Sequence, residues 1–318
     1  MNYEALIEER QSLRSFEQKE VPAAALQEVE RYFGETARIL PEIGLELHCA
    51  AGIGTGLEGI AGYGGNAFRA PLYLVVLSEE KEGWLENAGF VSEQLLLKLT
   101  ELGISACWLT LTDEAATKRA LGIESDKKAA ALLAVGYARA ERAEKRLDID
   151  TPANVKVDTR AGHIAPKISE QALFFEEKFG QEASFVEDQF DPVLDKALYA
   201  ASLAPSFHNR QAYRYLQAGR DLYLLDGADE KTTAEDRQLS LGATMANFWL
   251  VYSNYNPAAA RWEIGGEASA EMQLPAEYRV AAKLRLYEIS IRLGTFYGTD
   301  NVASRQRRPM DRRQQRAP

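Results

Sequence analysis

Two series of segments follow one another in the same order along this 318-residue chain. The stretch from Ala5 to Phe16 has a counterpart from Ala172 to Phe185, and each leads to a proline, Pro22 or Pro192, that can open a helix. Ordered self-similarity of this kind indicates an internal duplication, in which each half repeats one supersecondary pattern. Each half then reads helix, helix, strand, strand, long helix, strand.

The later segments of the two series also match in order. The matched pairs are 45–52 with 213–219, 72–77 with 222–225, the long helices starting near Gly89 and Gly242, Trp108 with Trp262, and 129–136 with 280–286. The offset between the series falls from about 168 to about 150 residues across 53–70. The first half therefore carries an extra loop, which is rich in glycine.

These matches define the expected organisation of the chain. We predict a first half over residues 1–150, a connection over 151–168, and a second half over 169–303. The connection contains Pro152, Gly162 and Pro166, which favour turns over regular structure. Residues 304–318 form a basic tail with six arginines and one aspartate over 305–318, which we expect to be disordered.

The composition is that of an ordinary globular protein, with 46% hydrophobic and 26% charged residues. No apolar run reaches membrane-spanning length, and the acidic N-terminus is unlike a signal peptide. The net charge of −10 argues against a nucleic-acid partner. Cys49 and Cys107 lack further ligands at metal spacing, so we expect free thiols, no metal site and a cytoplasmic location.

The first candidate site segment is Arg10-Gln-Ser12-Leu-Arg14, directly after a short amphipathic run. In an extended segment side chains alternate, so Arg10, Ser12 and Arg14 point to one side. Two guanidinium groups and a hydroxyl on one side can bind a phosphate group through charge-assisted hydrogen bonds. The alternative is that both arginines are surface charges paired with neighbouring glutamates.

The second segment is Pro205-Ser206-Phe-His-Asn209-Arg-Gln211, which follows a helical run from Leu194 to Leu203. Its proline, serine and asparagine are also the usual residues of a turn that ends a helix. We interpret His208, inside this segment, as a surface turn residue.

Together the two segments resemble the nitroreductase family, in its internally duplicated single-chain form. In that family an Arg-x-Ser-x-Arg segment of one subunit and a Pro-Ser-x-x-Asn segment of the other bind flavin mononucleotide (FMN). The resemblance implies an α+β fold, with an antiparallel-rich sheet flanked by helices in each half. It also implies that this chain is a pseudo-dimer within one monomer.

The resemblance adds further FMN-binding candidates. Arg146, and next to it Lys145, correspond to a basic cluster after the last strand of the first half. Leu109 and Thr110 end the stretch Gly103–Thr110, where the family's backbone amides approach the flavin N5 edge. A family tryptophan is absent after Gln211, where this chain has Ala212-Tyr213. Arg307–Asp311 resembles the end of a nitroreductase subunit.

The repeat also predicts how many flavins the chain binds. Phe179, Gln181 and Ala183 stand opposite Arg10, Ser12 and Arg14. The counterparts of Pro205, Ser206 and Asn209 are Glu35, Thr36 and Ile39. Since a second pocket lacks both segments, including the two phosphate-binding arginines, we expect one FMN that bridges the halves.

The expected activity is hydride transfer from NAD(P)H through FMN to a small electron-poor acceptor, such as a nitroaromatic or a quinone. We name no catalytic residue, because the flavin carries the chemistry while the protein orients it. A non-catalytic flavin sensor or store, or an interaction scaffold without cofactor, is the alternative. Gly54, Gly56 and Gly59 also fit a dinucleotide-binding motif, but we favour a mobile loop over the flavin because nearby glycines would break the required helix.

Overall fold

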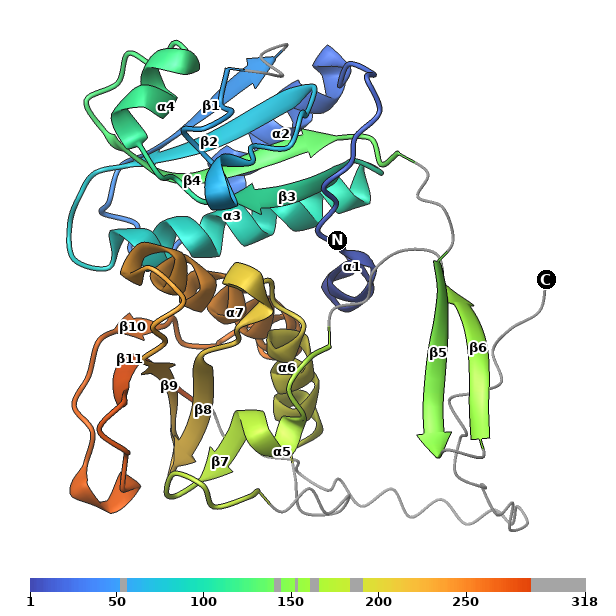
Figure 1. Cartoon of the computed structure of the whole chain (residues 1–318). Helices are drawn as coiled ribbons and strands as arrows, with labels where there is room; N and C mark the ends of the chain where they lie inside the picture. The colour runs from blue at the N-terminus through green and yellow to red at the C-terminus, as the bar shows by residue number, and fades with distance from the viewer. Residues whose placement is uncertain (52–55, 140–143, 152–153, 161–165, 184–190, 287–318) are drawn as a thin grey trace, which may run out of the picture. The chain divides into compact units, whose positions relative to one another are not determined.

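The computed structural model describes residues 1–51, 56–139, 144–151, 154–160, 166–183 and 191–286 (Figure 1). Residues Met1–Tyr287 form one compact unit by their contacts. Within it lie two multi-stranded sheets, each accompanied by its own helices. The fold is therefore α+β with antiparallel-rich sheets, as the sequence predicts. The segment 287–318, with Arg307–Asp311 and the basic tail, lies outside the described residues.

The first sheet has the strand order β1-β2-β4-β3, and every neighbouring pair is antiparallel. Its elements are α1 (Tyr3–Glu9), α2 (Ala23–Glu35), β1 (Leu45–Ala51), β2 (Leu72–Ser78), α3 (Trp84–Glu101), β3 (Ser105–Leu109), α4 (Glu114–Ala120) and β4 (Lys128–Gly136). All seven residues of β2 are buried, because side chains from both faces of the sheet enter apolar clusters. One face packs on α3, and the other packs on the loop from Leu57 to Ala70.

The second sheet has the order β7-β8-β9-β11-β10. Its elements are α5 (Glu170–Leu173), β7 (Phe174–Glu176), α6 (Pro192–Ser202), β8 (Tyr213–Ala218), β9 (Asp221–Gly227), α7 (Ala234–Tyr255), β10 (Glu263–Ile264) and β11 (Tyr278–Arg285). The order β8-β9-β11-β10 is that of the corresponding strands β1-β2-β4-β3. This agreement supports the proposed duplication, because two unrelated sheets would have no reason to share one strand order.

The long helices α3 and α7 pack against each other between the two sheets (Figure 1). Gly89 and Gly242 lie inside these helices, so the expectation that the helices start near them is wrong. A Cβ atom on Gly89 would lie 2.3 Å from the Leu239 carbonyl oxygen, and one on Gly242 would lie 2.2 Å from the Glu86 carbonyl oxygen. The two glycines are therefore required where the helix backbones touch.

Three features differ from the sequence expectation. Residues 144–151 and 154–160 form an antiparallel hairpin, β5 (Glu144–Thr151) and β6 (Asn154–Arg160), that begins before the predicted connection and occupies part of it. The edge strand β3 and the short helix α4 were also not predicted, because both are too short for a clear apolar period. The described part contains no helix with the length and apolar character needed to cross a membrane.

The dinucleotide-binding alternative does not hold in the structure. Strand β1 pairs with β2 in antiparallel fashion, and residues 56–71 contain only a 3₁₀ turn, Tyr63–Gly65. A Rossmann site needs a parallel strand followed by a helix whose N-terminus faces the pyrophosphate. Neither of these elements is present here, and Gly54 lies outside the described residues.

Candidate functional site

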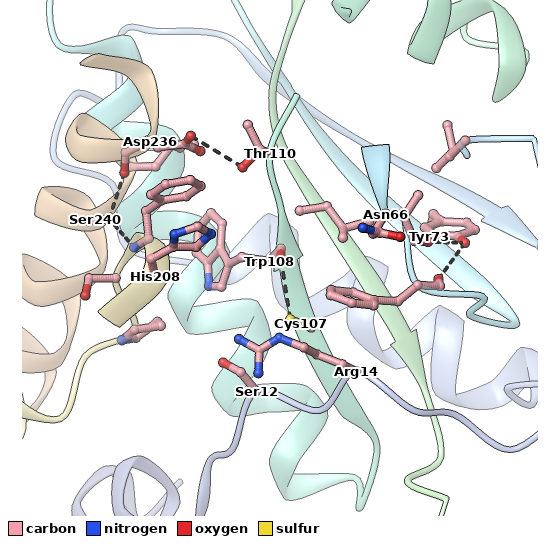
Figure 2. Close-up of a pocket in the computed structure, with 18 of the residues that line it drawn as sticks. Ser12, Arg14, Asn66, Tyr73, Cys107, Trp108, Thr110, His208, Asp236 and Ser240 are labelled. Carbon is pink, nitrogen blue, oxygen red and sulfur yellow. Dashed lines mark hydrogen bonds between the residues drawn. The ribbon is translucent and has the colours of Figure 1, made fainter. Parts of the chain in front are cut away.

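One cavity of about 420 Å³ lies between the two sheets, against α7 and the end of β3 (Figure 2). Segments that are far apart in sequence form its walls: the N-terminal segment, the loop before β2, the end of β3, the turn after α6, and the first turns of α7. The lining residues are Ser12, Arg14, Leu57, Glu58, Asn66–Arg69, Tyr73, Cys107–Thr110, Pro205–His208, Asp236, Leu239, Ser240 and Ala243.

Ser12 and Arg14 reach the cavity because the N-terminal segment runs beside β3. Ser12 forms an isolated parallel bridge with Ala106, and the Leu13 N–H donates to the Ala106 carbonyl at 3.2 Å. This extended backbone turns the two side chains to the same wall, as alternation requires. The Arg14 guanidinium lies 5.9 Å from the centre of the Phe68 ring.

Arg10 does not line the cavity. Its guanidinium forms a buried ion pair with Glu93 of α3 at 3.4 Å and donates to the Ser12 hydroxyl at 3.3 Å. A further hydrogen bond, of 3.4 Å, goes to the Leu203 carbonyl at the end of α6. Arg10 therefore joins the N-terminal segment to α3 and to the end of α6. Its hydrogen bond to Ser12 connects it to the cavity wall.

A second buried cation accompanies this pair. The Lys167 ammonium donates to the Ala204 carbonyl at 2.7 Å, so Lys167 and Arg10 bind neighbouring carbonyls where α6 ends. Burial raises the pKa of the fully buried Glu93 to about 7, with Arg10 and Lys167 opposing that rise. Burial, with Arg10 nearby, lowers the pKa of Lys167 to about 8. These three charges fix the backbone that leads into Pro205 and Ser206.

The turn after α6 brings Pro205 and Ser206 into the cavity wall from the second half. The Phe207 N–H donates to the Ser240 hydroxyl at 3.2 Å, which fastens the turn to α7. His208, Asn209 and Gln211 all have positive φ angles, at 48°, 56° and 49°. Residues other than glycine rarely adopt a positive φ angle, and backbone strain of this kind is often found at binding sites.

Asn209 and Gln211 are not among the residues that line the cavity. The Asn209 amide donates to the Pro166 carbonyl at 2.6 Å. The buried Gln211 accepts a hydrogen bond from the Ile168 N–H at 3.0 Å and donates to Pro166 and to Asn209. Both side chains therefore hold the end of the connection against the turn.

Leu109 and Thr110 line the cavity at the end of β3. The Thr110 carbonyl accepts a hydrogen bond from the Gly62 N–H at 2.7 Å, so the loop before β2 is joined to β3 at this point. The Tyr73 hydroxyl holds the same loop through Ala67, Phe68 and Ala70. The glycine-rich insertion of the first half is thus a wall of the cavity over its described residues, 56–70.

Several lining residues were not predicted from the sequence, among them Asp236, Trp108 and Phe68. Asp236 lies in the first turn of α7 and accepts hydrogen bonds from Thr233 at 3.0 Å and from Thr110 at 3.4 Å. Burial raises the pKa of its carboxyl group. His208 is exposed on its turn, as interpreted, yet it also lines the cavity. The position of His208 inside the Pro205–Gln211 segment is the sequence feature that could have indicated its place in the cavity wall.

The remaining predicted residues are Lys145 and Arg146. Their backbone lies in β5, but their side chains fall outside what the structure describes. Cys107 lines the cavity, and Cys49 lies in β1. Both thiols are free, and burial raises the pKa of each, that of Cys49 to about 12.

Comparison with known families identifies this architecture. Residues 2–251 match the model of a family described as "Putative TM nitroreductase". The chain belongs to this nitroreductase family. The family assignment places the protein among oxidoreductases. No sequence among curated proteins matches the chain.

The fold of this nitroreductase-family chain is similar to that of a solved structure over most of its length. A "putative nitroreductase" of Thermotoga maritima superposes with a TM-score of 0.55 at 16% identity, over 90% of this chain and 94% of that one. A nitroreductase family protein of Clostridium novyi NT gives a TM-score of 0.39 at 18% identity, over 44% of this chain and 86% of that one. An FMN-dependent nitroreductase of Clostridium difficile R20291 gives 0.38 at 19% identity, over 43% and 88%.

Proposed function

We propose that the cavity binds one FMN and that the protein is an NAD(P)H-dependent oxidoreductase. The flavin, when bound, would take hydride from NAD(P)H and pass it to an electron-poor acceptor such as a nitroaromatic or a quinone. The observation that carries this proposal is the convergence of Ser12 and Arg14 from one half with Pro205 and Ser206 from the other. A single chain supplies both halves, so we propose a monomer.

The lining fits a flavin in both size and chemistry. A volume of about 420 Å³ lies within the range of roughly 300 to 1,000 Å³ that is usual for small-ligand sites. Arg14 and Ser12 offer a cation and a hydroxyl for a phosphate. Apolar and aromatic side chains that suit a flat ring come from the other walls: Leu57, Phe68, Trp108, Leu109, Pro205 and Leu239.

The protein's part in the reaction is to bind and orient. Arg14 and Ser12 would hold the phosphate end, and Arg10 would act indirectly by holding Ser12 in place. Glu58 and Arg69 line the cavity with mostly exposed side chains, so the cavity opens to solvent on their side. Reductant and acceptor would enter there in turn. We assign no proton-transferring residue to the hydride step.

The test is reconstitution with FMN, followed by turnover. Purified protein should quench FMN fluorescence on titration and should then oxidise NADH or NADPH faster when a quinone is added. Arg14→Ala and Ser12→Ala should weaken FMN binding, while Gln181→Ala, at the position of the second half that matches Ser12, should not. Bound FMN without turnover would favour a flavin sensor or store, and no FMN binding would favour a scaffold.

A further inference from the structure

Asp236 is the acidic side chain that meets the interior of the cavity from α7. Its carboxylate oxygen Oδ2 accepts hydrogen bonds from the Thr233 hydroxyl of its own helix and from the Thr110 hydroxyl at the end of β3. The bond to Thr233 belongs to the helix cap, because the Thr233 hydroxyl also accepts from the Asp236 N–H at 3.0 Å. Capping explains that bond but not the one to Thr110, which crosses from one half to the other.

The charges of the cavity are separated along its walls. Arg14 and Ser12 lie together on one side, and Asp236 with Thr110 lies on another, with Trp108 and His208 drawn between them (Figure 2). Glu58 and Arg69 face each other at 3.8 Å in exposed positions, so their charges largely offset. The groups that act on the Asp236 charge are Thr233, Thr110, Glu235 and His208.

This separation has a consequence for any two ligands that share the cavity. A phosphate is attracted to Arg14 and repelled by Asp236, so a phosphorylated flavin would place its ring toward the Asp236 side. A second, flat ligand on that ring would then meet a carboxylate in a region of reduced dielectric constant. Charge interactions are stronger there than in water.

We infer that Asp236 selects the electron acceptor by charge, admitting uncharged or cationic flat aromatics and rejecting anionic ones of the same shape. Asp236 is thus a specificity-determining residue rather than a catalytic one. The inference rests on the proposed function, because it assumes that a flavin occupies the Arg14 side. It adds a substrate class, since carboxylated and sulfonated aromatics would be poor acceptors.

The experiment compares two non-reducible probes of nearly equal shape, benzamide and benzoate, on the FMN-loaded protein. Their dissociation constants are measured from the change in the flavin absorbance spectrum, which needs no turnover. The wild type should bind benzoate at least about tenfold more weakly than benzamide. Asp236→Asn, which keeps a capping side chain, should reduce that ratio to within about threefold.

Two further variants serve as controls. Glu235→Gln removes the same charge from an exposed neighbour on the same helical turn and should leave the ratio unchanged. Asp236→Glu keeps the charge and should keep the discrimination. Turnover of 4-nitrobenzamide and 4-nitrobenzoate should follow the same pattern in kcat/KM.

Each failure has its own signature. If FMN does not bind to the wild type, the proposed function fails and the inference fails with it. If FMN binds but the wild type holds benzoate as tightly as benzamide, only the inference is overturned. The same conclusion follows if neither probe binds, or if Asp236→Asn changes the ratio no more than Glu235→Gln does.

Discussion

On each side of the α3–α7 helix pair, a loop is held by a hydrogen bond from its backbone to a side chain of one long helix, but only one of the two loops lines a cavity. On one side, the turn after α6 is fastened by a bond from the Phe207 N–H to Ser240, two residues before Gly242. On the other side, the loop after α2 is fastened by a bond from the Leu40 N–H to Asn87, two residues before Gly89. The first turn lines an open cavity, whereas the second loop is packed with apolar side chains.

Several contacts close the second side. Ile39 is 5% exposed, and the Gln94 amide bonds both the N–H and the carbonyl of Ala37. A Cβ atom on Gly83 would lie 2.7 Å from Leu40 and 3.2 Å from Ile264, which shows how tightly these groups pack.

The residues of the second half that match Arg10 and Arg14 are also packed among apolar side chains. Phe179, the counterpart of Arg10, packs its ring between Phe175 and Tyr278 at centroid distances of 4.8 and 4.6 Å. Ala183, the counterpart of Arg14, is buried. The comparison teaches that two similar arrangements can differ in packing, since one side lines a cavity and the other contributes to the apolar core.

The largest expected loss of stability concerns the contact between α3 and α7, which the two sides share. Gly89→Ala would place a methyl group 2.3 Å from a backbone carbonyl, so we expect the protein to lose more than about 3 kcal/mol of stability or to fail to fold. Gly34→Ala in α2 has no atom within 4 Å and should change stability by less than about 1 kcal/mol. Urea denaturation measures both, and equal losses would contradict the packing account.

The second prediction separates the two sides directly. Ile39→Ala removes buried methyl groups on the closed side and should cost roughly 2 to 4 kcal/mol of stability without changing FMN affinity. Ser206→Ala on the open side should weaken FMN about tenfold and cost about 1 kcal/mol of stability, because its hydroxyl accepts a hydrogen bond of 3.1 Å from the Gln211 N–H. Thermal unfolding and FMN titration of both variants decide the matter. Loss of FMN affinity in Ile39→Ala would contradict the prediction that the closed side contributes to stability alone.

A third prediction uses the buried carboxyl group of Glu93, whose matched position in α7 is Ala246. A pKa of about 7 in the folded protein exceeds the ordinary value of 4.5, so folding favours the protonated carboxyl. This contribution is complete below pH 4.5 and is lost as the pH rises through 7, by on the order of 3 kcal/mol. Glu93→Gln should flatten the unfolding free energy between pH 4.5 and 7.

Lys167 has the opposite sign in a different window. Its pKa of about 8 lies below the ordinary 10.5, so its contribution is complete above pH 10.5 and is lost as the pH falls through 8.

Glu82→Gln, at an exposed position just before α3, is the matched control for Glu93→Gln. An unchanged pH profile in Glu93→Gln, like that of the control, would show that Glu93 does not titrate in this range.

The fourth prediction is the smallest in free energy but the most specific to the ligand. Arg14→Ala should weaken FMN binding by roughly 10- to 100-fold, because hydrogen bonds to charged groups contribute about 1.5 to 3 kcal/mol. Its thermal midpoint without ligand should stay close to that of the wild type, since Arg14 is exposed. An FMN affinity that does not change would exclude Arg14 from the phosphate end.

Much of this architecture could be read from the sequence. Apolar runs such as Leu72–Leu77 and the proline-led helix at Pro192 have strong local signals, and both elements form where expected. Strand alternation predicts that Ser12 and Arg14 share one side, and the family resemblance makes these two residues, with Pro205 and Ser206, candidates for one site. All four residues line one cavity.

The rest depended on contacts that no local pattern encodes. Arg10 matches the phosphate-binding motif, but its partner Glu93 lies on a distant helix, so its burial could not be foreseen. Asp236 lies at the cavity because α7 packs against α3, and that contact joins segments far apart in the sequence. The β5–β6 hairpin had a period-2 signal in Leu147 and Ile149, which the neighbouring proline obscured.

The central claim is that one chain holds one flavin, in a cavity built from both halves. Native mass spectrometry of the FMN-saturated protein measures this number directly. The account predicts one FMN per chain, lost in parallel from Arg14→Ala and Ser206→Ala although these residues belong to different halves. Two FMN per chain, or one FMN that resists both substitutions, would contradict it.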